Sequence, residues 1–354
     1  MNKALGGTLA LGLLLAAVGC GGGGGGDDEA TPPPTTSSGF SWSLPQGFPT
    51  PKESADNPLS TAKVELGRHL FFDLRMSINQ TMACASCHQP ARAFTDGRPT
   101  AVGATGEAHP RNAMSLTNVV YNATFNWANP GLATLHAQAL IPIFGEFPLE
   151  LGWSDHETEI LDRFRHDAIY QKLFADAYPG ETDPFDADRV AKAIAAFESI
   201  LISGNSPHDQ ANAPRQSQCH KRLRLGAVKS CSSPSGWNVF TATAVSTSAK
   251  SVNHAGTTLA QSEFHNNGLY NIGGTGDYPL NNRGLWEFTQ RPADMGRFRA
   301  PTLRNIELTA PYMHDGSIAT LEEVIGPLLA RRAADRSEGP LAGDGAKKPL
   351  SKAS

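Results

Sequence analysis

A CxxCH motif lies in the stretch Thr81-Met82-Ala83-Cys84-Ala85-Ser86-Cys87-His88. Two thiols at this spacing can form thioethers to the two vinyl groups of one haem, and the adjacent His then lies under the iron as its proximal ligand. A zinc site would need a second pair of ligands, and a thioredoxin-like redox motif would need a βαβ context. The sequence has neither. We therefore predict covalent haem c at Cys84 and Cys87, with His88 bound to the haem iron.

An export signal precedes this motif. Lys3 supplies a positive charge, and the apolar segment from Ala4 to Val18 is too short for a stop-transfer helix. Because Ala17-Val18-Gly19-Cys20 resembles a bacterial lipobox, we predict a lipoprotein signal peptide over residues 1–20 with lipidation at Cys20. An ordinary secretory signal is the alternative.

The segment after Cys20 is rich in Gly, Pro, Thr and Ser, so it predicts a flexible tether over residues 21–45. Export and lipidation together predict a periplasmic protein that touches a membrane only through its lipid anchor. In an oxidising compartment the two remaining cysteines, Cys219 and Cys231, could form a disulfide.

Composition limits the remaining classes of protein. The chain has 354 residues, of which 40% are hydrophobic and 8% aromatic, so it can bury a core and is not disordered throughout. Lys and Arg number 30 against 34 Asp and Glu, giving a net charge of −4. A strongly basic surface is therefore excluded, and nucleic acid is not expected as a partner.

Three segments have helical spacing of their apolar residues. They are Ser60 to Leu74 with Ser60 or Thr61 as N-cap, Asp155 to Ala177, and a segment that follows Asp186 and runs through Leu201. Long stretches rich in Gly, Pro and Asn separate them, and no short-period repeat is present. We expect a mostly α fold with long ordered loops that a large cofactor would hold in place.

Several longer strings resemble the bacterial dihaem cytochrome c peroxidase and MauG family, from about Phe48 to Ile325 with one gap. Two of them, Tyr270–Gly276 and Arg291–Gly296, are similar to the branch of methanobactin-associated dihaem enzymes. The others are Leu70-Phe71-Phe72-Asp73 with the CxxCH motif, Phe94-Thr95-Asp96-Gly97, Gly296–Asn305 and Ala310–Ser317. The resemblance implies two cytochrome c-like haem domains, an N-terminal peroxidatic one over 46–205 and a C-terminal one over 206–354.

The resemblance also implies roles for individual residues. Glu150 would be the acid/base that moves a proton between the peroxide oxygens, and Gln138 would orient the peroxide. Trp127 would relay electrons between the two haems. Asn112, with backbone oxygens near Arg299 and Pro301, would bind Ca²⁺ between the domains. We assign no role to His109, His136 or His314.

The gap falls where the family carries its second CxxCH motif, since this chain has only one. One permitted back-translation of Trp237 to Lys250, regrouped one base earlier, reads E-C-F-H-C-H-G-G-F-N-F-S-E, which contains a CxxCH with a family-like flank. Gly326 to Arg332, shifted by one base, can read D-H-Y-S-R-G-G, which resembles the family's continuation with its axial Tyr. We interpret residues of about 211–250, and those from about 326 onward, as frameshifted. On this reading Cys219 and Cys231 are accidents of translation, whereas the alternative is a divergent loop with a truncated tail.

The resemblance implies a dihaem peroxidase-like enzyme that reduces hydrogen peroxide at the N-terminal haem. Its electrons would come from a small redox protein or from a Trp or Tyr of a partner protein, and the Tyr270–Gly276 and Arg291–Gly296 strings favour the second source. A single-haem electron-transfer cytochrome is one alternative, because one CxxCH is encoded. An inactive product of a frameshifted gene is the other.

Overall fold

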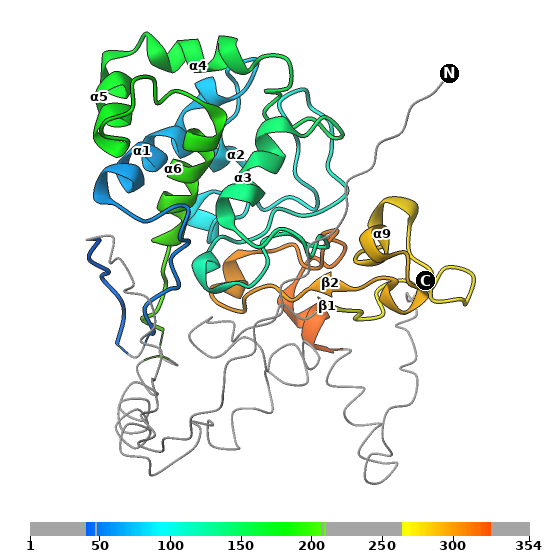
Figure 1. Cartoon of the computed structure of the whole chain (residues 1–354). Helices are drawn as coiled ribbons and strands as arrows, with labels where there is room; N and C mark the ends of the chain where they lie inside the picture. The colour runs from blue at the N-terminus through cyan, green and yellow to red at the C-terminus, as the bar shows by residue number, and fades with distance from the viewer. Residues whose placement is uncertain (1–39, 47, 207–208, 210–263, 327–354) are drawn as a thin grey trace, which may run out of the picture. The chain divides into compact units, whose positions relative to one another are not determined.

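The computed structural model describes residues 40–46, 48–206, 209 and 264–326, and in these ranges helices dominate (Figure 1). The longer helices all lie in the N-terminal part, and the only paired strands of the described ranges lie in the C-terminal part. The helices are α1 (Thr61–Phe72), α2 (Cys84–Cys87), α3 (Leu135–Phe144), α4 (Glu157–Arg165), α5 (Ala168–Ala177), α6 (Ala187–Ser199) and α9 (Trp286–Thr289), and the strands are β1 (Phe264–His265) and β2 (Phe298–Arg299). The expectation of a mostly α fold with long loops is confirmed.

Helices α1 and α6 pack against each other (Figure 1), and both begin where the sequence predicts. The side chain of Ser60 caps α1 by accepting a hydrogen bond from the Lys63 amide, and Asp186 caps α6 by accepting one from the Arg189 amide. At their contact, a Cβ on Gly67 would lie 1.8 Å from the carbonyl oxygen of Ala193. The two backbones therefore touch at a position where only glycine fits.

The segment Asp155 to Ala177, predicted as a single helix, is in fact two helices. Helix α4 ends at Arg165, and α5 begins at Ala168. The side chain of Asp167 accepts a hydrogen bond from the Ile169 amide, so it caps a new helix instead of continuing the old one. Apolar periodicity runs across the break, which is why the spacing alone did not reveal it.

Side chains from α1 to α6 fill one core around the CxxCH segment. Its fully buried members include Phe71, Phe164, Phe174 and Trp153, and the Trp153 indole N–H donates to the carbonyl of Met76 at 2.6 Å. Helix α3, which the sequence analysis did not predict, adds Leu135, Ala139 and Ile143 to this core. At the edge of the core, hydrogen bonds between polar side chains link the end of α1 to α5.

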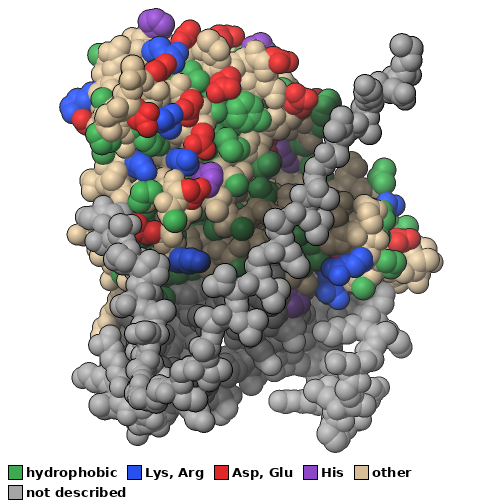
Figure 2. Space-filling model, in the orientation of Figure 1, with side chains coloured by type: hydrophobic (Ala, Val, Ile, Leu, Met, Phe, Trp, Pro, Cys, Tyr) green, Lys and Arg blue, Asp and Glu red, His purple; other side chains and the backbone are tan. Residues whose placement is uncertain are grey.

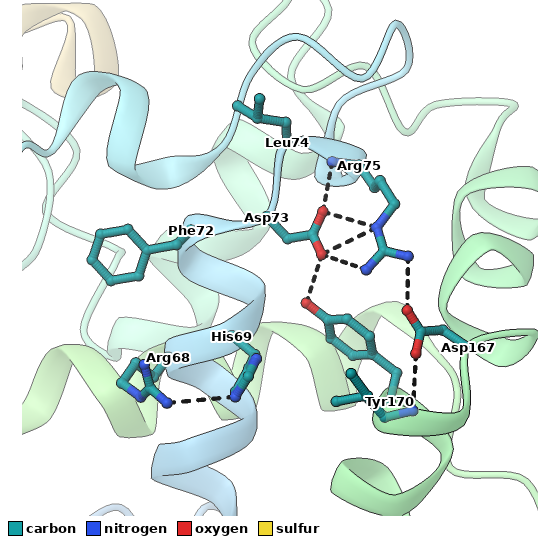
Figure 3. A pocket seen from close by; sticks show the side chains of 9 residues that line it. Arg68, His69, Phe72, Asp73, Leu74, Arg75, Asp167 and Tyr170 are labelled. Carbon is teal, nitrogen blue, oxygen red and sulfur yellow. Dashed lines mark hydrogen bonds and ion pairs between the residues drawn. The ribbon is translucent and has the colours of Figure 1, made fainter.

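That network lines a surface pocket of about 510 Å³ at the end of α1 (Figure 3). The Asp73 carboxylate accepts hydrogen bonds from the Arg75 guanidinium, from the Arg75 amide and from the Tyr170 hydroxyl. Arg75 also contacts Asp167, the cap of α5, at 3.0 Å. Burial alone would raise the pKa of Asp73, but these hydrogen bonds outweigh it and lower that pKa.

The described C-terminal residues form a smaller second core. Strands β1 and β2 pair antiparallel, with Phe264 opposite Arg299, and Leu269, Tyr278 and Phe298 are buried together with Ala128. Arg111 reaches Glu287 with a contact of 2.6 Å, and the Asn112 amide donates to the His314 carbonyl at 2.7 Å. These bonds join residues 264–326 to the loop that follows the CxxCH motif.

Some predictions concern residues outside the described ranges. They are the lipobox with Cys20, the pair Cys219 and Cys231, the frameshift interpretation of about 211–250, and the chain after Gly326. Within the described ranges, no helix has both the length and the apolar character to cross a membrane. On the face seen in Figure 2, Lys and Arg are interspersed with Asp and Glu, in agreement with the near-neutral composition.

Candidate haem site

The two cysteines of the CxxCH motif begin and end the one-turn helix α2. Residues three apart lie on the same side of a helix, so both thiols face one space. The turn is held by the Ser86 hydroxyl, which accepts from the Ala83 amide at 3.0 Å, and by the His88 amide, which donates to the Cys84 carbonyl at 2.9 Å. Both thiols are free and half-buried.

The ring of His88 is oriented by the backbone beyond the motif. Its Nδ1 lies 2.9 Å from the carbonyl oxygen of Phe94. If Nδ1–H is the donor, Nε2 keeps its lone pair, and this is how a metal-bound His is usually held. Ala93 and Phe94 have φ of 51° and 61°, an uncommon conformation for non-glycine residues that turns the Phe94 carbonyl back toward the ring. Burial lowers the pKa of His88, which favours the neutral, metal-binding imidazole.

The surroundings of the thiols bear on the rival interpretations of the motif. A zinc site would need further ligands, and the described residues contain no group of three or more His, Cys, Asp or Glu that could hold a metal ion. Burial raises the pKa of both thiols, to about 12 for Cys87. Glu198 and Glu150 raise the pKa of Cys84 further, and Asp96 and Glu150 raise that of Cys87, which Arg98 partly opposes. The residues present fit covalent haem c.

Glu150 lies on the loop that follows α3, within electrostatic reach of both thiols. The Ala104 amide donates to its carbonyl at 2.9 Å, and the next residue, Leu151, donates to the Pro142 carbonyl of α3 at 3.0 Å. Burial raises the pKa of the Glu150 carboxyl to about 7, although 33% of the side chain is still exposed. Its neighbour is His109, whose Nδ1 is 3.7 Å from the carboxylate and whose Nε2 is buried without a partner.

Gln138 lies on α3, and its side-chain oxygen accepts from Asn126 Nδ2 at 3.3 Å. This bond leaves the Gln138 amide N–H groups as donors. The described residues show no hydrogen bond between Gln138 and Glu150: the Gln138 side chain contacts Asn126, and the Glu150 carboxylate lies near His109.

Trp127 connects the other predicted residues. Its indole N–H donates to the Asn112 carbonyl at 2.8 Å, and its own carbonyl accepts from the Arg299 amide at 2.8 Å. The family resemblance placed Asn112 near Arg299, and the fold adds that both residues bond to Trp127. Pro301 lies two residues after Arg299 in the chain and is half-buried.

The predicted calcium ligands are neutral oxygens, a type that Ca²⁺ accepts. The described residues contain no group of three His, Cys, Asp or Glu that could hold a metal ion. The guanidinium of Arg299 is buried and donates to the carbonyls of Asn126 and Ala300, and burial lowers its pKa to about 10. The guanidinium brings a positive charge to the residue whose backbone oxygen is predicted to bind calcium, and calcium binding here stays a prediction.

Sequence reasoning missed two features of the site. The Phe94 carbonyl that orients His88 belongs to the backbone, so side-chain patterns do not reveal it. The second is Glu198, a buried carboxyl on α6. The sequence contained a signal for its burial, because Glu198 lies four residues after Ile194 and therefore on the apolar face of the helix.

The comparisons with known proteins agree with this site. The family described as "Di-haem cytochrome c peroxidase" matches residues 61–217. Methylamine utilization protein MauG of Methylorubrum extorquens is 31% identical over 284 residues, covering 79% of this chain and 71% of that protein. Cytochrome c551 peroxidase of Pseudomonas aeruginosa is 29% identical over 279 residues, covering 77% and 73%.

Comparison with solved structures also finds dihaem peroxidases and MauG-like proteins. A MauG-like protein associated with microbial copper homeostasis is 41% identical, covers 81% of each chain and has a TM-score of 0.69, which agrees with the branch expected from the sequence. The dihaem peroxidase BthA of Burkholderia thailandensis shares the fold, with a TM-score of 0.54 at 19% identity. The chain belongs to the dihaem cytochrome c peroxidase and MauG family of haem c oxidoreductases.

Proposed function

We propose that this protein reduces hydrogen peroxide at a haem c held by Cys84, Cys87 and His88. The observation that carries the proposal is the Glu150 carboxyl, which lies near both haem-attaching thiols and has a pKa of about 7. Such a group is half ionised near neutral pH, as general acid–base catalysis requires. The balanced reaction takes one peroxide, two electrons and two protons to two waters.

A haem held by Cys84, Cys87 and His88 would supply the redox chemistry of peroxide reduction. Glu150 takes the proton from the near oxygen and returns it to the far oxygen, which then leaves as water. Gln138 donates a hydrogen bond that orients the peroxide, since its carbonyl oxygen is already occupied by Asn126. His109 positions the Glu150 carboxylate.

Trp127 is proposed as the relay toward the second haem. Its hydrogen bonds to Asn112 and Arg299 support this role, because they link the N-terminal segment to residues 264–326. The electrons would come from a Trp or Tyr of a partner protein, with a small redox protein as the alternative donor. The Tyr270–Gly276 and Arg291–Gly296 strings, which resemble the methanobactin-associated branch, favour the first source. A periplasmic, lipid-anchored location through Cys20 is compatible with both sources.

The proposal includes calcium bound by oxygens of Asn112, Arg299 and Pro301, between the N-terminal segment and residues 264–326. Chelation followed by calcium addition tests it. A change in the haem spectrum that calcium reverses is expected if the ion bridges the two segments, and no change on chelation contradicts the site.

The alternative of a single-haem electron-transfer cytochrome is supported by the one encoded CxxCH. We predict one covalent haem per polypeptide for the chain as encoded and two for a frame-corrected chain. A pyridine haemochrome assay per protein mass measures this ratio. Two haems on the encoded chain would refute the frameshift interpretation.

Glu150→Gln tests the peroxidase proposal. Rapid-mixing spectra with hydrogen peroxide should show the haem reacting about 10² to 10⁴ times more slowly, with haem content unchanged. Because Glu150 must first accept a proton, the wild-type rate should rise with pH through about 7, and the variant should lack this rise. Glu146→Gln, on the exposed part of the same loop, is the matched control. Equal rates for the two variants would remove Glu150 from the mechanism.

A further inference from the structure

Tyr270 is a half-buried tyrosine that the proposed peroxide reaction does not use. Its ring packs against the second core, which contains Leu269, Tyr278 and Phe298. Its hydroxyl donates a hydrogen bond to the carboxylate of Asp315. A tyrosine that gives up an electron also releases its phenolic proton, and a base that is already hydrogen-bonded to the hydroxyl assists this step.

The six tyrosines of the chain all lie in the described ranges, and they differ in the group that accepts a hydrogen bond from the hydroxyl. A carboxylate can take up the proton of an oxidised phenol, whereas a neutral carbonyl or amide oxygen is a far weaker base. Tyr170 also donates to a carboxylate, but that group, Asp73, is held by the Arg75 guanidinium at 2.7 Å. Asp315 instead accepts from the Ser317 amide at 3.1 Å. The other hydroxyls donate to neutral oxygens: Tyr121 to Pro49, Tyr178 to Arg189, Tyr278 to Asn266 and Tyr312 to Ile306.

The Asp315 carboxylate is in the right state to act as this base. Burial by itself would raise the pKa of Asp315, but hydrogen bonds from Tyr270 and Ser317 lower it, so the group is ionised at neutral pH. Burial and the hydrogen bond to Asp315 raise the pKa of Tyr270, so the phenol keeps its proton until an electron leaves.

Hydrogen bonds connect this pair to Trp127, the proposed relay. The Trp127 indole N–H donates to the Asn112 carbonyl at 2.8 Å, and the Asn112 amide donates to the His314 carbonyl at 2.7 Å. His314 directly precedes Asp315 in the chain. Two hydrogen bonds and a short stretch of backbone therefore join the indole to the residue that accepts from Tyr270.

Aromatic rings provide a second connection. The ring centroids of Tyr270 and Tyr278 are 5.4 Å apart, and Tyr278 is 6.3 Å from both Phe298 and His314. Phe298 stacks on His314 with the centroids 3.7 Å apart. Trp127 packs against the same core, so an electron can cross it in short steps.

Tyr270 is the member of this ring cluster that lies next to exposed chain. Tyr278, Phe298 and His314 are buried, whereas Tyr270 is half-buried and residues 271–275 after it are exposed. Ile272, two residues further on, is 50% exposed. A protein that docks on this loop would therefore meet Tyr270 before the other rings of the cluster.

We propose that Tyr270 is the point at which electrons from the partner protein enter this chain. Tyr270 gives one electron, by way of Trp127, to the haem that peroxide has oxidised, and its phenolic proton moves to the Asp315 carboxylate. The neutral Tyr270 radical then takes one electron from a Trp or Tyr of the partner, and the proton returns from Asp315. This inference rests on the proposed function, because hydrogen peroxide is the oxidant of the haem.

Electron paramagnetic resonance of the haem-loaded full chain, without its partner, tests the proposal. One arm uses hydrogen peroxide, and the other uses flash-generated tris(bipyridine)ruthenium(III), a one-electron oxidant that does not depend on the peroxide reaction. Both should produce a radical signal that narrows when the protein contains ring-deuterated tyrosine, which identifies it as tyrosyl. Tyr270→Phe keeps the ring but cannot form this radical, so it should lose most of the signal.

Asp315→Asn keeps the shape of the side chain but removes the base, so radical formation should slow by about 10². Asp315→Glu restores a carboxylate and should recover most of the rate. Tyr170→Phe is the matched control, because Tyr170 also donates to a carboxylate but packs in the N-terminal core. This variant should keep the signal. Haem content and circular dichroism of each variant verify folding.

The two arms separate failure of this inference from failure of the peroxidase function. A haem that does not react with peroxide, combined with a ruthenium-generated signal that Tyr270→Phe removes, would refute the peroxidase function and support the role of Tyr270. A tyrosyl signal that Tyr270→Phe largely retains in either arm would overturn the proposal. So would a haem that reacts with peroxide without any tyrosyl signal, or the absence of that signal with both oxidants.

Discussion

At the contact between α1 and α6, helix propensity and overpacking have opposite effects on stability when Gly67 is replaced by Ala. Gly67→Ala places a Cβ 1.8 Å from the Ala193 carbonyl oxygen and 2.4 Å from its carbonyl carbon. An ordinary contact needs about 3.5 Å, so the helices would have to separate by about 1.7 Å. Helix propensity alone favours alanine by about 1 kcal/mol, whereas overpacking costs about 1–3 kcal/mol.

The overlap at Gly67 is with backbone atoms, which cannot rotate away as a side chain can, so the cost should lie at the upper end of that range. We expect a net loss of about 2 kcal/mol in the free energy of unfolding, and a fall of about 4–8 °C in Tm. Thermal unfolding of the haem-loaded protein, followed by circular dichroism, measures this. Gly131→Ala is the control, because its Cβ would meet only the side-chain oxygen of Asn129 at 3.3 Å. A Gly67→Ala protein as stable as the wild type would refute the backbone contact.

Two further predictions concern the haem attachment and the network at the end of α1. Replacing Cys84 and Cys87 together by Ala should abolish covalent haem, so haem staining of a denaturing gel should be negative; a full signal would contradict the assignment. Asp73→Asn should cost about 1–2 kcal/mol at pH 7, because it weakens the bonds to Arg75 and Tyr170. The pKa of Asp73 is lowered in the fold, so its carboxylate stabilises the folded protein above about pH 4. The difference in free energy of unfolding between the wild type and Asp73→Asn should therefore disappear as the pH falls further. Urea unfolding of both proteins at about pH 7 and about pH 3.5 measures this change.

The local features of this protein could be predicted from its sequence. Cys84, Cys87 and His88 predict haem c because the chemistry of attachment depends on their spacing, and that spacing is a property of the chain. The beginnings of α1 and α6 were predictable because an N-cap side chain bonds to an amide only three residues away. The break between α4 and α5 was missed, because continuous apolar spacing masked the cap at Asp167.

The contacts between residues distant in the chain depend on the tertiary fold. Gly67 appears in the sequence as a weak helix residue, but in the fold it is the contact point with Ala193. Trp127 bonds to both Asn112 and Arg299, which lie far apart in the chain. The charge states of Glu150 and Glu198 also depend on the fold, because burial raises the pKa of a carboxyl and burial results from the packing of segments distant in sequence.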